Sequence, residues 1–133
     1  VCGMERRHIN PESAPDSEAH GYSHAIVADG TFYISGQVGM DSERNLAGDD
    51  ITAQTRQAFD NVEAILAEID RDMSDVVKVK AHIVDPHERF AEYNEVYRAV
   101  FSEPYPCHTV LGVEQLAGPE YLVEIEVDVP VGN

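Results

Sequence analysis

Tryptophan is absent from the 133-residue sequence, cysteine occurs twice, and no apolar run approaches the length of a transmembrane helix. Cys2 and Cys107 are too few for the disulfide framework of a small secreted protein, and they form no Cys-x-x-Cys pair. No basic segment followed by an apolar stretch opens the chain. We therefore expect no membrane partner and a cytoplasmic location, in which thiols stay reduced.

Positive charge is also scarce, with 9 lysines and arginines against 25 acidic residues and a formal net charge of −16 at pH 7. This charge repels the phosphate backbone, so we expect no nucleic-acid partner. The acids are spread through segments with clear apolar periodicity, which is typical of a folded acidic surface. We hypothesise a halophilic source, because salt at about 1 M shortens the Debye length to about 3 Å and relaxes the repulsion. An acidic protein from ordinary salt is the alternative.

Motifs for metal ions and cofactors are missing too. His20 and His24 are four residues apart in a segment predicted to be a loop and a strand start, where this spacing does not align two ligands. There is no His-Glu-x-x-His motif and no cysteine-rich pattern, so we expect no metal ion and no other cofactor. Cys107 stands beside His108, but neighbours on a strand point to opposite faces. We interpret Cys107 as a packed or interface thiol rather than an activated nucleophile.

The N-terminal part of the chain carries the signals of a small antiparallel unit. Glu5–Ile9 is a short strand candidate, followed by a polar loop. Tyr22–Ala28 and Thr31–Ser35 are predicted to be strands, and Asp29-Gly30 between them is a strong hairpin signal. The second strand runs into a glycine at position 36, which either lets another group approach the backbone or only relieves a bend.

Two amphipathic helices are predicted. Between residues 51 and 69, apolar residues recur every three or four positions, and Asp50 precedes them where an acid satisfies free amide groups. The second helix has stronger start signals: Asp85 as the N-cap, Pro86 at the first helical position and Glu88 three residues after the cap.

The remaining segments alternate apolar and polar residues with the period of a strand. The runs His108–Val113 and Tyr121–Val129 flank a Gly118-Pro119 turn, so we predict that they form a hairpin. Residues 75–84 and 121–129 each place apolar side chains on one face: Val77, Val79, Ala81 and Ile83 in the first, and Val123, Ile125, Val127 and Val129 in the second. The opposite face of the second run carries Glu124, Glu126 and Asp128.

The predicted order is therefore β-β-β-α-β-α-β-β, which favours an α+β fold with two helices on one face of a mainly antiparallel sheet. We expect residues 1–133 to form one domain. The residues Val1-Cys2-Gly3 before Met4 are either a native start or an added segment. A sheet of this kind has a second face that needs cover, which is a reason for subunits to associate.

Several motifs occur in an order and spacing that are specific only in combination. They are Gly21-Tyr22-Ser23-His24-Ala25, residues 32–37 (FYISGQ), 54–62 (QTRQAFDNV), 90–97 (FAEYNEVY), 106–108 (PCH) and 123–126 (VEIE). With them the chain resembles, over nearly all its length from about Met4, the RidA/YjgF family of imine and enamine deaminases, also described as endoribonuclease L-PSP-like. The resemblance implies a chorismate-mutase-like fold and a homotrimer with ligand clefts between subunits.

The resemblance also assigns candidate site residues. Glu124 matches the acid that handles the catalytic water, and His108 occupies the position that clamps the substrate carboxylate, which is usually arginine in the family. Pattern alone would favour an ordinary outward-facing acid at position 124. The positions that match or neighbour the substrate-binding residues of the cleft are Tyr22, Ser35, Gly36, Asn94, His108 and Val110.

The implied function is hydrolysis of small reactive imines and enamines such as 2-aminoacrylate. Arginine grips a carboxylate with two parallel hydrogen bonds and a permanent charge, whereas histidine offers one directed bond and is mostly neutral at pH 7. We therefore expect weak or altered activity. A noncatalytic protein that binds a small metabolite in the cleft is the alternative, and RNA cleavage is a remote one that the negative charge disfavours.

Overall fold

The structure, a computed structural model, describes residues 5–132, so Cys2 and the start at residues 1–3 lie outside the described residues. The predicted order of strands and helices is confirmed. The elements are β1 (Arg6–Ile9), η1 (Glu18–His20), β2 (Ala25–Ala28), β3 (Thr31–Val38), α1 (Ile51–Ala67), η2 (Met73–Asp75), β4 (Lys78–Val84), α2 (Pro86–Val100), β5 (Cys107–Val113) and β6 (Val123–Pro130).

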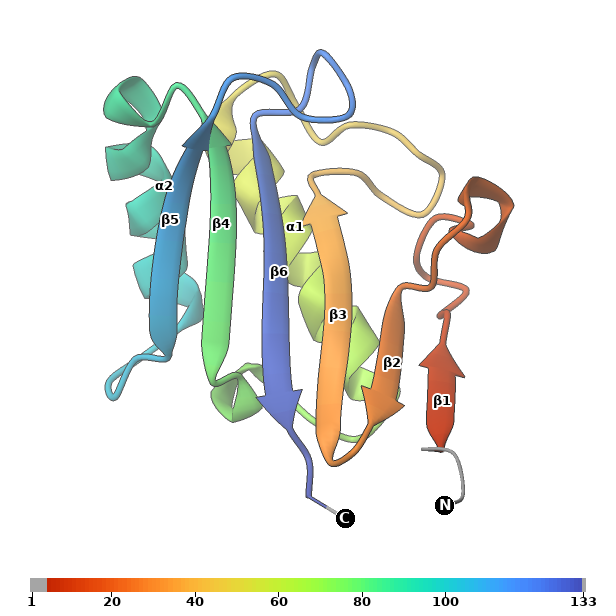
Figure 1. Ribbon diagram of the computed structural model, residues 1–133. Helices are drawn as coiled ribbons and strands as arrows, with labels where there is room; N and C mark the ends of the chain where they lie inside the picture. Colours follow the sequence, from red (N-terminus) through yellow and green to blue (C-terminus); the bar gives the residue numbers. More distant parts are fainter. Residues whose placement is uncertain (1–4, 133) are drawn as a thin grey trace.

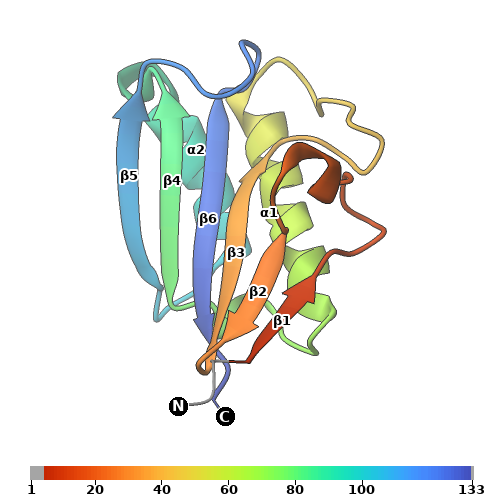
Figure 2. The ribbon, with the colours of Figure 1, turned by 45° about the vertical axis from the view of Figure 1, so that its right-hand side comes forward.

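The six strands form one sheet in the order β1-β2-β3-β6-β4-β5. Only β4 and β5 are paired in parallel, through a connection that contains α2. Both helices cover the same face of the sheet, and the described chain leaves the other face uncovered (Figures 1 and 2). This arrangement confirms the α+β fold with two helices on one face. No helix in residues 5–132 is long and apolar enough to cross a bilayer.

The prediction of a C-terminal hairpin between β5 and β6 is wrong. β6 does not pair with β5; it lies between β3 and β4 and is antiparallel to both. β5 instead forms the edge of the sheet, where it pairs with β4 alone. The reason is burial: β6 has apolar side chains buried along its whole length and belongs at the centre, whereas β5 buries fewer side chains.

The N-terminal hairpin is confirmed, with Thr31 of β3 opposite Ala28 of β2. Both turn residues have positive φ, 49° for Asp29 and 74° for Gly30. This backbone is the one that two-residue hairpins favour, and aspartate and glycine adopt it at little cost.

The helix starts agree with the sequence only in part. The side chain of Asp50 accepts a hydrogen bond from the Ala53 amide at 2.7 Å, so the predicted cap of α1 is confirmed. Asp85 stands at the start of α2, but its φ is 55° and its side chain makes no capping bond. Its carboxylate lies 4.0 Å from the Arg89 guanidinium instead. The predicted positions of Asp85 at the N-cap and Pro86 in the first turn are therefore confirmed, but the Asp85 side chain does not cap the helix.

The core lies between the helices and the helix-facing side of the central strands. The predicted apolar face of β6 is buried throughout, as are Val79, Ala81 and Ile83 of β4. Val77 differs from the prediction: it precedes β4, is 50% exposed, and Val76 is buried in its place. Burying each large aliphatic side chain contributes roughly 1.5–3 kcal/mol, so this layer stabilises the packing of the sheet against the helices.

Candidate functional site

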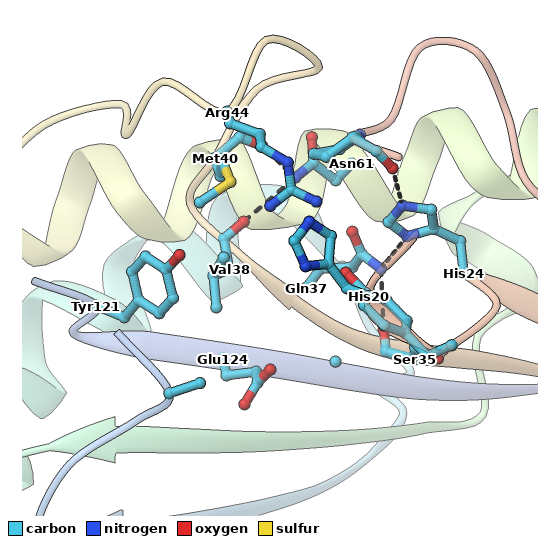
Figure 3. Close-up of a pocket in the computed structure, with 14 residues that line it drawn as sticks. His20, His24, Ser35, Gln37, Val38, Met40, Arg44, Asn61, Tyr121 and Glu124 are labelled. Atoms are coloured by element: carbon cyan, nitrogen blue, oxygen red, sulfur yellow. Dashed lines mark hydrogen bonds between the residues drawn. The ribbon is translucent and has the colours of Figure 1, made fainter. Parts of the chain in front are cut away.

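A pocket of about 380 Å³ opens at the end of β3, beside the start of β6. Residues of the loops before β2, after β3 and before β6 surround it, so strands supply the floor and loops supply the walls (Figure 3). Four predicted site residues line this pocket together: Tyr22, Ser35, Gly36 and Glu124. His20, Arg44, Asn61 and Tyr121 line it too, and sequence reasoning did not assign them to a site.

Glu124 and Gly36 meet at an irregularity in the sheet. The pairing of β3 with β6 shifts between Ile34 and Gln37, which is the signature of a bulge. A Cβ atom at position 36 would lie 2.7 Å from Oε1 of Glu124 and 2.8 Å from its Cδ. Glycine is therefore needed for the carboxylate to lie on this strand, which confirms close approach over a simple bend.

The carboxyl group of Glu124 is half-buried in this setting. Burial raises its pKa above the ordinary value of a glutamate. Charges on the neighbouring side chains act in opposite directions, because His82 lowers the pKa and Glu126 raises it. An acid with a raised pKa in a pocket can exchange protons near neutral pH more readily than an exposed one.

A buried histidine fixes the wall of the pocket. Nε2 of His24 donates to the carbonyl of Pro15 at 2.7 Å, which leaves Nδ1 to accept from the amide of Gln37 at 3.1 Å. Both ring nitrogens are used within the protein, so His24 supports the loop before β2. Ser35 is fixed similarly, since its hydroxyl donates to the carbonyl of Ser23 at 2.6 Å.

Two polar residues of α1 tie the loops to the scaffold. The amide of Asn61 donates to the carbonyls of Val38 and Met40 at 3.2 and 2.8 Å. Gln54 is fully buried, donates to the carbonyls of Gly48 and Glu120, and accepts from the Leu122 amide. The available sequence signal was polar residues seven positions apart on the core-facing side of α1, where apolar residues are expected.

His108 lies in a different environment, an aromatic cluster between β5 and α2. Its ring stacks on Tyr97 with centroids 3.9 Å apart and planes inclined by 5°. Its Nε2 is 2.8 Å from the hydroxyl of Tyr93, with which it shares a hydrogen bond. Burial lowers the pKa of His108, and the ammonium of Lys78 lowers it further, so both favour the neutral ring.

The two parts of the predicted site lie on opposite faces of the sheet in one chain. His108 and Val110 pair with Val79 and Ala81, which face the helices. Asn94 follows Tyr93 on α2, on the same side of the sheet. Glu124 lies between the buried residues Val123 and Ile125 and so points to the uncovered face. A single chain therefore does not bring Glu124 and His108 together.

Known proteins match this chain over the segments that carry both Glu124 and His108. The family described as "Endoribonuclease L-PSP" matches residues 11–131. A RutC family protein from Pyrococcus horikoshii is 37% identical over 106 residues, 79% of this chain and 82% of that protein. The Homo sapiens protein named 2-iminobutanoate/2-iminopropanoate deaminase is 34% identical over 117 residues, 87% of this chain and 84% of that protein. A crystal structure of RidA from the Antarctic bacterium Psychrobacter sp. has a TM-score of 0.86 at 36% identity, covering 94% of this chain and 99% of that one.

Proposed function

Because the chain belongs to the RidA/YjgF family, we propose that it hydrolyses small reactive imines and enamines of amino-acid origin, such as 2-aminoacrylate. The observation that carries the proposal is the half-buried carboxyl group of Glu124, lying on Gly36 in a pocket of small-molecule size. The deaminase name of the human relative supports the same reaction class.

The proposed reaction needs one acid and one water. Glu124 donates a proton to the enamine carbon, which converts the enamine to an imine; the carboxylate then directs water to the imine carbon. The C–N bond of the resulting adduct breaks, and the products are a 2-oxo acid and ammonia. Burial raises the pKa of Glu124, which favours the protonated form that the first step needs.

His108 distinguishes this chain within the proposal. A neutral imidazole that already stacks on Tyr97 and shares a hydrogen bond with Tyr93 offers at most a weak contact to a carboxylate. The loss of a bidentate charged pair lowers affinity, since hydrogen bonds to charged groups contribute about 1.5–3 kcal/mol. We propose weak or altered activity on 2-aminoacrylate for this reason.

The same geometry supports a proposal about assembly. We propose a homotrimer in which the uncovered sheet face of one chain meets the β5 edge of the next, so that Glu124 and His108 of different chains share a cleft. The uncovered face carries exposed Tyr33 and Leu111 beside the Lys80–Glu126 ion pair. Light scattering in high and low salt should give the mass of three chains; a monodisperse monomer in high salt would contradict the trimer.

The activity is tested by coupling the protein to an amino-acid dehydratase that releases 2-aminoacrylate. Purified protein should accelerate formation of the 2-oxo acid above the spontaneous rate. Glu124→Gln should reduce this acceleration about 10²- to 10⁴-fold, the usual contribution of a general acid or base. Glu126→Gln is the matched control, because it removes an acid from the same strand face outside the pocket. A trimer that binds the 2-oxo acid without accelerating its formation would support the binding alternative.

A further inference from the structure

Arg44 is a cation in the pocket that neither the sequence nor the family resemblance assigned. Figure 3 shows its guanidinium reaching over the cavity from the loop after β3, with Glu124 on the opposite wall and His20 between them. Among the 14 residues drawn around this pocket, Arg44 is the only lysine or arginine. A small molecule in the cavity would therefore meet a permanent positive charge at one end and the acid at the other.

The guanidinium is only partly engaged within the protein. One nitrogen of Arg44 donates to the backbone carbonyl of Asp16 at 2.6 Å, which holds the side chain across the mouth of the pocket. Neither of the two ion pairs found in residues 5–132 involves Arg44. Arginine has five N–H donors, so most of its donors remain for a ligand.

The backbone of Arg44 adopts an unusual conformation. Its φ is 66°, a left-handed value that glycine or asparagine adopts more easily. The turn is held by the carboxylate of Asp41, which accepts from the amides of Glu43 and Asn45, and by a hydrogen bond from the Arg44 amide to the Asp41 carbonyl. A residue that strains a surface turn while pointing a cation into a pocket indicates a role for the side chain.

We propose that Arg44 binds the carboxylate of the substrate and supplies the charge that His108 lacks. This assignment rests on the proposed function for the identity of the carboxylate ligand. Arginine can hold both carboxylate oxygens at once, and its charge persists at all pH values of interest. In a protein of net charge −16, a cation inside the pocket also lowers the local repulsion of an anionic substrate.

Calorimetric titration with 2-oxobutanoate tests the contact without requiring turnover. Arg44→Gln should weaken binding about tenfold to a hundredfold, the loss expected for a charged hydrogen-bonded pair. The uncharged 2-oxobutanamide should bind both proteins with similar affinity. Arg56→Gln, a substitution at an exposed arginine of α1 outside the pocket, should bind 2-oxobutanoate like the wild type.

A second variant separates binding from folding. Arg44→Gly should lose affinity as Arg44→Gln does while melting at the same or a higher temperature, because glycine relieves the positive φ. Equal binding of 2-oxobutanoate by wild type and Arg44→Gln, equal losses for the acid and the amide, or no binding by the wild type would each overturn the assignment. Arg44-dependent binding without hydrolysis of 2-aminoacrylate would sink the proposed function alone. Hydrolysis with an unchanged KM in Arg44→Gln would sink the Arg44 assignment alone.

Discussion

Glu124 and His108, the two titratable residues of the proposed site, lie in contrasting environments. Glu124 lies on a bulged strand against a glycine, with its carboxyl group free to face a ligand. His108 is held by a stacked tyrosine on one side and a tyrosine hydroxyl on another. The acid of the proposed reaction therefore lines a pocket that a ligand can enter, whereas the histidine at the proposed clamp position makes its contacts within the chain.

Displacing the Glu124 carboxyl group should affect the reaction most. Gly36→Ala places a methyl group within 2.8 Å of the carboxyl carbon, so the side chain must move. We expect kcat to fall about a hundredfold, because a misplacement of about 1 Å can cost that much. In the Glu124→Gln background the same substitution should cause little further loss; a full additional loss there would mean that Gly36 acts on something else.

A permanent positive charge at position 108 should strengthen substrate binding at the proposed carboxylate clamp. His108→Arg is expected to raise kcat/KM for 2-aminoacrylate about tenfold, with Glu124 still required. The gain should be larger in the Arg44→Gln background, because two guanidinium groups otherwise compete for the same carboxylate oxygens. Wild-type activity equal to that of an arginine-bearing relative would show instead that the neutral ring suffices.

The strand faces could be predicted from the sequence, but the strand neighbours and the position of Arg44 could not. Alternation in β6 predicted its buried and acidic faces, but alternation does not say which strands become its neighbours, so the predicted hairpin with β5 was wrong. Likewise, an arginine in a polar loop carries no periodic signal. Arg44 lines the pocket from a loop whose turn is held by hydrogen bonds to Asp41, and these contacts exist only in the folded chain.

The two regions should respond to pH in opposite directions. Burial lowers the pKa of His108 in the folded state, so the stability it contributes is complete above its unfolded pKa and is lost as pH falls through the folded value. Between about pH 7 and pH 5, the wild type should therefore lose stability relative to His108→Phe. Urea titrations of both proteins across this range measure the difference; a constant gap would contradict it.

For Glu124 the sign is reversed. Its pKa is raised in the folded state, so its stability contribution is complete below the unfolded pKa and is lost as pH rises through the folded value. Glu124→Gln should gain stability relative to the wild type when pH rises from about 4 to about 7. Glu126→Gln serves as the control, and a Glu124→Gln gap that does not widen with pH would show that the acid is not buried in solution.

Salt should have a small effect on the melting temperature if the acidic surface belongs to an ordinary mesophile. The effect should be larger if the surface is halophilic. With a net charge of −16, removing salt restores the mutual repulsion of the acids. We expect the melting temperature to fall steadily from molar to near-zero salt. A flat melting temperature would reject the halophilic hypothesis and leave the fold unaffected.

The central proposal is that Glu124 and His108 from opposite faces of the sheet meet between neighbouring chains, and mixing two inactive variants tests it most directly. Glu124→Gln removes the acid, and His108→Glu places a repelling charge at the carboxylate position. After chains are exchanged in equal amounts, about a quarter of the clefts should contain both wild-type residues, so activity should return to about a quarter of the wild-type value. No recovery from mixed trimers whose chains have demonstrably exchanged would contradict a site shared between subunits.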